Sequence, residues 1–183
     1  CSDIVSLASN LLDISKMDEG KLVVRAENLD ISYVQTIAEK FSVNTLFEEK
    51  EIQPVIIPSK EKFTIYADVY LLERVLQNLF SNAAKYVPRH GKVEMHFEAG
   101  EKENLICFFN SGVAIPEKER EILFEKYARI EQHHSQYSKG LGLFFCRMVM
   151  NAHKGRIWVE TDQHGNHFKL AFPKKLPENT DSV

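Results

Sequence analysis

Two pairs of neighbouring strand-like segments set the tightest limit on the fold of this chain of 183 residues. In the first pair, residues 91–100 alternate apolar and polar side chains, and the apolar run 104–110 follows after a short polar turn. The second pair, residues 156–162 and 167–173, is joined by the turn-like sequence QHGN. Because short turns join antiparallel neighbours, these pairs predict a sheet in which most strands are antiparallel.

Segments with helical periodicity separate the strand-like segments. Apolar residues recur every three or four positions in four places, which are residues 4–17, 32–50, 69–87 and 140–155. Two further short β-rich runs lie between the second and third helices. This order predicts an α+β fold, a two-layer α/β sandwich with a mixed, mainly antiparallel sheet and helices packed on one face.

Local signals define the ends of the third and fourth helices. Asp68 can cap a helix that starts at Val69, and Pro88 prevents this helix from continuing beyond Val87. His153 stands near the end of the fourth helix, where a histidine is expected to complement the negative end of the helix dipole.

Charge, hydropathy and cysteine content exclude several classes of function. The net charge of −3 indicates no basic surface, and we expect no nucleic-acid partner. No apolar run approaches ~20 residues and no signal peptide is visible, so we expect a cytoplasmic domain without direct membrane insertion. Cys1, Cys107 and Cys146 are far apart and are predicted to be free thiols in a reducing compartment. The chain starts inside a helical pattern without an initiator methionine, so we expect it to be part of a longer protein.

Five side chains that are unusual for an ordinary amphipathic helix share one face of the third helix. They are Arg74, Asn78, Asn82, Lys85 and Tyr86, and their spacings of three and four residues place them together. Amide oxygens can ligate a hard cation such as Mg²⁺, a lysine can contact phosphate, and an aromatic ring can stack on a base. The alternative is a solvated polar face without a ligand.

The end of the second strand-like run carries a possible ligand-binding turn. Asn110 ends the run, and Gly112 permits either a tight turn or a close approach of the backbone to a ligand. A plain turn without a ligand is the alternative interpretation of these residues.

A second glycine motif opens the fourth helix. Gly140 and Gly142 follow the polar, aperiodic segment 126–139, which is typical of a mobile loop, and Lys139 stands beside them. Backbone N–H groups and the helix dipole make such a helix start a favourable binding site for an anion. A flexible helix start without a ligand is the alternative.

The order of these segments resembles the catalytic and ATP-binding domain of sensor histidine kinases, the gyrase-type (Bergerat) ATP-binding fold, over roughly residues 1–173. The run LQNLFSNAAKY resembles the asparagine box of that family, ILFEKYARI is similar to its phenylalanine box, and KGLGLFFCRMVMNAHKGRIWVET is close to its second glycine box. LLDISKMDEGKL looks like the end of the dimerisation helix and its linker. The resemblance therefore implies three parts, which are the helix end and linker at 1–20, the catalytic domain at 21–173, and a polar tail or linker stub at 174–183.

The resemblance also implies roles for the polar face of the third helix. Asn82 would hold Mg²⁺ with support from Asn78, Lys85 would contact phosphate, and Tyr86 would lie against the adenine. Gyrase-type ATPases carry a glutamate that activates water at the position of Asn78. An amide cannot take a proton at neutral pH, which suits a kinase better than a hydrolase.

The segment before the fourth helix is implied to close over the phosphates. Arg129 matches a family arginine that can reach the terminal phosphate. Gly140 and Gly142 would hinge this lid and bind phosphate, with Lys139 beside them.

The first glycine box departs from the family pattern Asp-x-Gly-x-Gly. Here Asn110 replaces the aspartate whose carboxylate accepts a hydrogen bond from the adenine amino group. Gly112 retains the first glycine, whereas Ala114 replaces the second and adds a methyl group. Arg74 stands where the family usually has glutamine or glutamate.

The implied function is that of the ATP-binding catalytic domain of a two-component sensor histidine kinase, of simple or hybrid architecture. It would transfer the γ-phosphoryl group of Mg²⁺-bound ATP to a histidine on a dimerisation helix that this chain lacks. The implied partners are the phospho-accepting dimerisation helices of the same protein, homodimeric in its full-length form, and a response regulator receiver domain. The alternative is a degenerate pseudokinase module. Such a module would bind nucleotide weakly or not at all, or bind a guanine nucleotide, and would signal through protein contacts.

Overall fold

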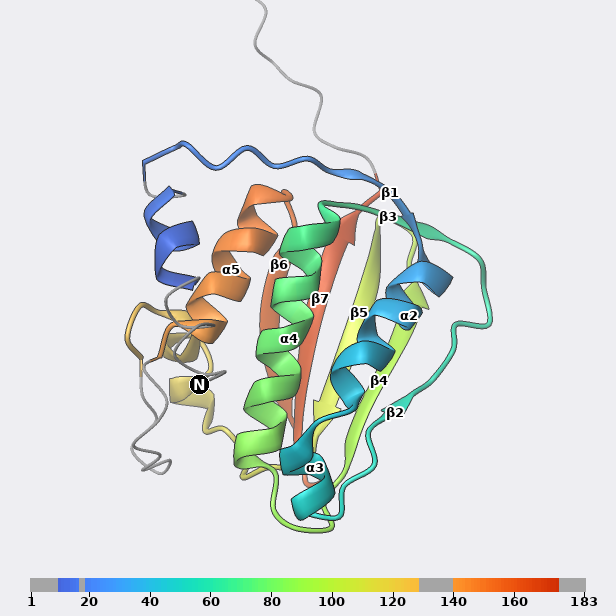
Figure 1. Cartoon of the computed structure of the whole chain (residues 1–183), viewed down its shortest axis with the longest axis vertical. Coiled ribbons are helices and arrows are strands. Elements are labelled where there is room, and N and C mark those ends of the chain that lie inside the picture. Colours follow the sequence, from blue (N-terminus) through green and yellow to red (C-terminus); the bar gives the residue numbers. More distant parts are fainter. Residues whose placement is uncertain (1–9, 17–18, 129–139, 175–183) are drawn as a thin grey trace, which may run out of the picture.

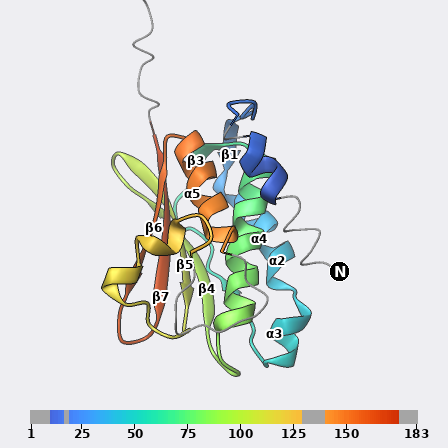
Figure 2. The same ribbon diagram turned by 90° about the vertical axis from the view of Figure 1, so that its left-hand side faces the viewer.

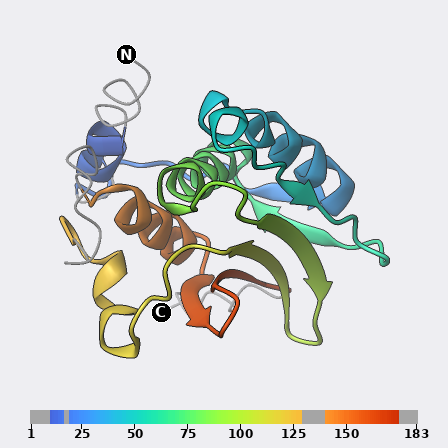
Figure 3. The same ribbon diagram turned by 90° about the horizontal axis from the view of Figure 1, so that it is seen from below.

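The structure is a computed structural model that describes residues 10–16, 19–128 and 140–174. It has two layers, a five-stranded sheet and a layer of helices that covers one face of this sheet (Figures 1 and 3). The predicted fold class is therefore confirmed. Within the described ranges, no helix combines the length and the apolar character that crossing a bilayer requires.

The main sheet contains both predicted hairpins. Its strands follow the order β2 (Val55–Ile56), β4 (Val93–Ala99), β5 (Glu103–Asn110), β7 (Asn166–Pro173) and β6 (Arg156–Thr161). The pair β2–β4 is parallel and the other three pairs are antiparallel. A separate antiparallel pair, which the sequence did not predict, joins β1 (Glu27–Asp30) to β3 (Thr64–Ala67).

Within the described residues the helices follow the predicted segments with one exception, and residues 4–9 and 17 of the first predicted helix lie outside the described ranges. They comprise the helical residues 10–16, α2 (Ile31–Ser42), α3 (Thr45–Glu49), α4 (Val69–Tyr86), α5 (Gly142–Ala152) and the 3-10 helices η1 (Glu117–Glu119) and η2 (Ile122–Phe124). The segment expected to be helical over residues 32–50 is two helices. Val43 is extended after α2, and the Asn44 side chain starts α3 by accepting the N–H of Leu46 at 2.9 Å.

Side chains from distant segments fix the start of α4. Asp68 caps the helix as predicted, since its Oδ1 accepts the N–H of Leu71 at 3.1 Å. The N–H of Asp68 donates to Nε2 of His153 at 2.8 Å, and Nδ1 of His153 lies 2.7 Å from the carbonyl oxygen of Val149. An Nε2 that accepts an N–H carries no proton, so this arrangement requires the hydrogen on Nδ1. His153 ends α5 as expected, but it links the helix to α4 as a hydrogen-bonding group rather than as a charge at the dipole.

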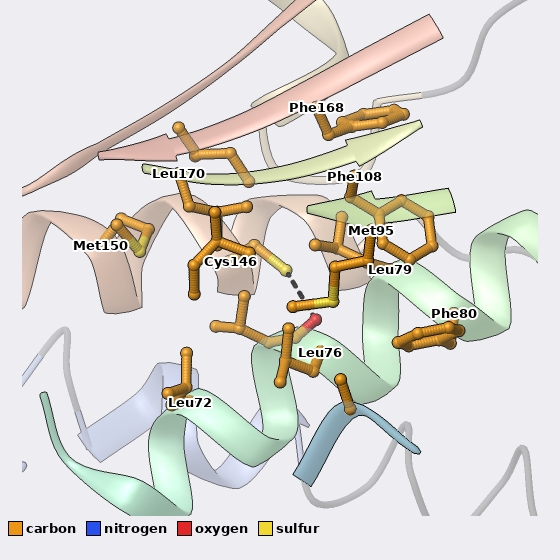
Figure 4. Close-up of a cluster of buried hydrophobic side chains, with 14 of the residues drawn as sticks. Leu72, Leu76, Leu79, Phe80, Met95, Phe108, Cys146, Met150, Phe168 and Leu170 are labelled. Atoms are coloured by element: carbon orange, nitrogen blue, oxygen red, sulfur yellow. Dashed lines mark hydrogen bonds between the residues drawn. The ribbon is translucent and has the colours of Figure 1, made fainter. Parts of the chain in front are cut away.

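The apolar face of α4 lies at the centre of the core (Figure 4). Leu72, Leu76, Leu79 and Phe80 of α4 lie beside side chains of the sheet and of α5, which are Met95, Phe108, Phe168, Leu170, Cys146 and Met150. The rings of Phe80 and Phe108 meet edge to face with centroids 4.9 Å apart. Burial of this stripe leaves the remaining sides of α4 for polar contacts.

Two of the three cysteines lie within the described residues, and both are buried free thiols, as predicted. Burial raises the pKa of Cys107 to about 12. Burial also raises the pKa of Cys146, whose Sγ lies 3.8 Å from the carbonyl oxygen of Val75 (dashed line in Figure 4). A thiolate is the nucleophilic form of cysteine, so neither residue is a reactive nucleophile at neutral pH.

Candidate functional site

Four half-buried side chains flank the apolar stripe of α4 and form one side of the candidate site. They are Asn78, Asn82, Lys85 and Tyr86. Among the described residues, none makes a hydrogen bond with the Asn82 side chain. Half-buried amides without a protein partner can accept or donate to a ligand, so Asn82 is the group on this face best placed to hold one.

Asn78 is held in place by three separate parts of the chain. Its Nδ2 donates to the carbonyl oxygen of Arg74 at 2.8 Å, and its Oδ1 accepts from Nδ2 of Asn10 at 3.2 Å. A Cβ atom on Gly142 would lie only 2.8 Å from the same Oδ1. Glycine at position 142 therefore lets the start of α5 approach the face of α4 that carries Asn78.

The two ends of the predicted lid meet at Gly140. Its φ is +66°, and a Cβ atom would lie 2.4 Å from the carbonyl oxygen of Ala128. The N–H of Tyr127 donates to the carbonyl oxygen of Gly140 at 3.1 Å. Only glycine fits this conformation and this contact without strain. Arg129 and Lys139, which the sequence places in the lid, lie outside the described residues.

The start of α5 offers backbone donors. Leu141 occupies the N-cap position, and no side chain of the described residues caps the helix there. The first N–H groups of a helix have no partner within the helix, and the positive end of the dipole lies at the same place. Together with the glycine contact to Asn78, this geometry favours an anionic ligand between α4 and α5.

The end of β5 is fixed by a relay of two buried asparagines. Oδ1 of Asn110 accepts the N–H of Gly112 at 3.1 Å and lies 3.5 Å from Nδ2 of Asn166. Oδ1 of Asn166 accepts the N–H of Ile115 at 3.0 Å, while its Nδ2 donates to the carbonyl oxygen of Val113 at 2.9 Å. Backbone groups have a fixed polarity, so these bonds orient both amides. The oxygen of Asn110 is turned toward the loop that follows β5.

Gly112 brings this loop against the end of α4. A Cβ atom at this position would lie 2.9 Å from Oδ1 of Asn110 and 3.5 Å from the carbonyl oxygen of Tyr86. Ala114 is exposed in the same loop. The structure therefore brings Tyr86, Asn110 and Gly112 together at the end of the molecule where α4 and β5 both terminate (Figure 1).

Arg74 belongs to the polar face of α4 in the sequence, but its contacts in the structure are structural. Nη1 lies 2.6 Å from Oδ2 of Asp13 and 3.0 Å from the hydroxyl of Tyr70, and Nη2 donates to Oδ1 of Asn10. The guanidinium also lies 5.0 Å from the centroid of the Phe145 ring. These contacts attach the helical residues 10–16 to α4 and α5. Asn10 and Asp13 are polar residues three positions apart, beside the apolar stripe of the first helix. This spacing is the sequence signal that could have indicated their contacts with Arg74.

Lys50 supports the other end of α4, and the sequence did not indicate it. Nζ of Lys50 donates to the carbonyl oxygens of Lys85 and Val87 at 2.9 Å and 2.8 Å. Burial lowers the pKa of this lysine. In the sequence Lys50 lies in a charged run that is typical of a solvated face, so no local pattern distinguishes it.

The described site residues can bind but offer no general base. Amide groups, one lysine and the first N–H groups of α5 can hold a phosphate group with a hard cation. None of the described site residues is a carboxylate or a histidine. The arrangement therefore suits positioning and charge neutralisation of a nucleotide better than activation of a water molecule.

Comparison with known proteins gives one family and several relatives. Residues 67–176 match the family described as histidine kinase-, DNA gyrase B-, and HSP90-like ATPase. The chain is 31% identical over 172 residues to the adaptive-response sensory kinase SasA of Rippkaea orientalis (strain PCC 8801 / RF-1). This match covers 91% of the chain and 43% of the relative, so the chain spans less than half the length of that protein.

Solved structures agree with the family match. The catalytic domain of histidine kinase ThkA in a nucleotide-free form is 27% identical with a TM-score of 0.66, over 81% of this chain and 98% of that chain. Histidine kinase ThkA in complex with the response regulator protein TrrA is 22% identical with a TM-score of 0.73. That second match covers 95% of this chain and 49% of the other, and it shows the fold alone.

Proposed function

Since the chain belongs to the family of histidine kinase-, DNA gyrase B-, and HSP90-like ATPases, we propose that it is the ATP-binding catalytic domain of a two-component sensor histidine kinase. In this proposal, Mg²⁺ and ATP bind between α4, the loop after β5 and the start of α5. The observation that carries the proposal is the approach of Gly142 to Asn78. Asn78 lies one helical turn from Asn82, whose amide has no hydrogen-bond partner among the described residues. This approach places the backbone donors of a helix start beside a candidate cation ligand.

Each side chain has a role that its environment can support. Asn82 would hold Mg²⁺, because an amide oxygen is a suitable ligand for a hard cation. No described residue makes a hydrogen bond with the Asn82 side chain. The bound Mg²⁺ would neutralise phosphate charge. Asn78 would orient the site, Lys85 and the first N–H groups of α5 would contact phosphate, and Tyr86 would lie beside the base. Arg129 and Lys139 remain predicted phosphate contacts from the lid.

The proposed reaction is transfer of the γ-phosphoryl group to a histidine on a dimerisation helix of the full-length homodimer. Asn78 is an amide, and an amide cannot remove a proton from water at neutral pH, so the site would not favour hydrolysis. A receiver domain of a response regulator is the proposed next acceptor, in line with the complex of ThkA with TrrA. The division into 1–20, 21–173 and 174–183 is the domain organisation that this proposal assumes.

A pseudokinase module is the second candidate, and one observation favours it. The oxygen of Asn110 accepts from Gly112 and faces Asn166, so it is engaged within the protein. The acceptor for the adenine amino group is therefore weakened at this position. A domain with this loop could bind ATP poorly and signal through protein contacts instead.

Calorimetric titration with Mg²⁺ and ATP decides between the two functions. We expect wild-type protein to bind Mg²⁺–ATP with a dissociation constant on the order of 10⁻⁴ M, corresponding to about 5 kcal/mol. Asn82→Ala should weaken binding by at least about tenfold, because the cation loses a ligand. Asn28 is an exposed asparagine on β1, at the opposite end of α4, and Asn28→Ala should leave the affinity unchanged. Absence of binding by the wild type would favour the pseudokinase.

A further inference from the structure

The face of the main sheet that the helices leave open carries a cluster of possible metal ligands. All the helices α2, α4 and α5 lie on the other face (Figures 2 and 3). Val93, Met95 and Phe97 of β4 are buried, whereas the alternate residues His96 and Glu98 are more exposed. Side chains alternate between the two faces of a strand, so His96 and Glu98 project from the open face.

Cys107 completes the cluster from the neighbouring strand. In the antiparallel pair β4–β5, Cys107 is the direct partner of His96, and Glu98 lies two residues further along the same face. One ligand atom from each of His96, Glu98 and Cys107 lies within 4.8 Å of the others. Nε2 of His96 is already 3.0 Å from Oε1 of Glu98.

These separations are close to those of a tetrahedral metal site. Zinc bonds of about 2.0 Å to nitrogen or oxygen and 2.3 Å to sulfur put tetrahedral ligand atoms roughly 3.3–3.6 Å apart. The three side chains can reach these separations by small rotations, because His96 and Glu98 are only partly covered. The pairing of β4 with β5 fixes His96 and Glu98 relative to Cys107, and β7 pairs with β5 on the other side of Cys107.

We propose that His96, Glu98 and Cys107 form a binding site for a divalent transition metal of the zinc class. One imidazole nitrogen, one carboxylate oxygen and one sulfur form a donor set that suits Zn²⁺ and Co²⁺, whereas Mg²⁺ and Ca²⁺ prefer oxygen alone. On binding, the thiol proton passes to solvent and the metal takes its place on the sulfur. A fourth position stays open to water or to a ligand from another molecule.

The charges around the cluster allow a cation. Lys169 of β7 is the cross-strand partner of Cys107 on its other side. Its Nζ pairs with Oε2 of Glu160 at 2.7 Å, so the charge of this lysine has its own counterion. Glu160 also accepts from Nε1 of Trp158 at 2.8 Å, which holds the carboxylate next to the lysine.

The alternative is a hydrogen-bonded cluster without a metal. The carboxylate of Glu98 lies beside the imidazole of His96 and within 4.8 Å of the thiol of Cys107, so the three groups can interact with one another without a metal. The two interpretations differ in one observable property. A metal site gives a cobalt–thiolate bond, and a hydrogen-bonded cluster does not.

Titration of the whole untagged chain with Co²⁺ tests the proposal. All proteins carry Cys1→Ser, because an N-terminal cysteine offers an amine and a thiol that can chelate the metal by themselves. We expect a thiolate-to-cobalt charge-transfer absorption that saturates at one Co²⁺ per chain and disappears when excess Zn²⁺ is added. Cys107→Ser should abolish the absorption, and His96→Gln or Glu98→Gln should weaken Co²⁺ binding at least about tenfold.

One control variant and two variants of the partly exposed ligands complete the test. Cys146→Ser changes the other buried thiol, on α5, and should leave the absorption and the affinity as they are. His96→Gln and Glu98→Gln alter partly exposed side chains, so they test the site even where Cys107→Ser fails to fold. Circular dichroism checks the fold of each variant. The proposal is overturned if the Cys1→Ser protein gives no charge-transfer absorption. It is also overturned if His96→Gln and Glu98→Gln in this background bind Co²⁺ as tightly as the Cys1→Ser protein does.

Discussion

The hydrogen bonds of Asn110 determine which part of its amide is left for the ligand of the proposed site. Its oxygen accepts the N–H of Gly112 and is turned toward Nδ2 of Asn166, and the backbone partners of Asn166 fix the direction of this relay. The NH₂ group of Asn110 is therefore the part of the amide left for a ligand. A donor at this position suits the carbonyl group of a guanine better than the amino group of an adenine.

Asn110→Asp should therefore change base selectivity. An aspartate can accept the N–H of Gly112 with one oxygen and present the other, charged oxygen to an adenine amino group. If the base lies here, Mg²⁺–ATP should bind about 5- to 10-fold more tightly and Mg²⁺–GTP more weakly, because a charged hydrogen bond is stronger by on the order of 1 kcal/mol. Calorimetry with both nucleotides measures the change, and Asn28→Asp on exposed β1 serves as the control. Unchanged affinities for both nucleotides would show that Asn110 does not face the base.

The helical residues 10–16 and α4 are joined by a buried charge pair. The side chains of Arg74 and Asp13 are only 9% and 10% exposed, and their atoms Nη1 and Oδ2 are 2.6 Å apart. Removal of one member of a buried pair leaves a charge without its partner, which is more destabilising than loss of an exposed pair. This contact therefore attaches the first helical segment firmly to α4.

A double-mutant cycle measures the strength of this attachment. Asp13→Asn and Arg74→Met should each lower the free energy of unfolding by roughly 3–5 kcal/mol, and the double variant should lose less than the sum of the two. Lys21→Met, which removes a largely exposed ion pair with Glu19, should change it by less than about 0.5 kcal/mol. Urea unfolding provides the values. Strictly additive losses would mean that the two side chains do not interact in solution.

Elements with complete local signals could be predicted from the sequence. The start of α4 follows from Asp68 and its end from Pro88, and the hairpin of β6 and β7 follows from its short turn. The pairing of β1 with β3 could not be predicted, because it joins segments that are separated by a whole helical region and carry no mutual signal. The break at Val43 was missed since the apolar period continues through it, although Asn44 is a good helix cap.

The candidate site was predictable in its residue types but not in its internal contacts. The spacing along α4 indicates that Asn78, Asn82 and Lys85 share a face, because helix geometry alone decides this. The bonds from Asn10 to Asn78 and from Asn166 to Asn110 join residues 68 and 56 positions apart, and no local pattern specifies such pairs. Tertiary contacts therefore determine how each amide is oriented, and hence which ligand it can serve.

For the molecule as a whole, Asn78 is the point where the first helical segment, α4 and α5 meet. Its oxygen accepts from Asn10, its nitrogen donates to Arg74, and Gly142 packs directly against it. A ligand that binds beside Asn78 and favours this orientation must also favour the docked position of residues 10–16. Such coupling is reciprocal, so the docked segment should in turn strengthen binding of the ligand.

Hydrogen exchange tests this coupling in the whole chain. We expect saturating Mg²⁺–ATP to slow amide exchange in residues 10–16 several-fold, because the bound state favours the docked helix. In Asn10→Ala the bonds to both Asn78 and Arg74 are lost, so the affinity for Mg²⁺–ATP should fall about 3- to 10-fold and the melting temperature should fall as well. Lys16→Ala, an exposed change on the same helical segment, should leave both measurements as in the wild type. The coupling is contradicted by two results together. Asn10→Ala would bind Mg²⁺–ATP as tightly as Lys16→Ala does, and the amide exchange rate of residues 10–16 would not change when Mg²⁺–ATP is added.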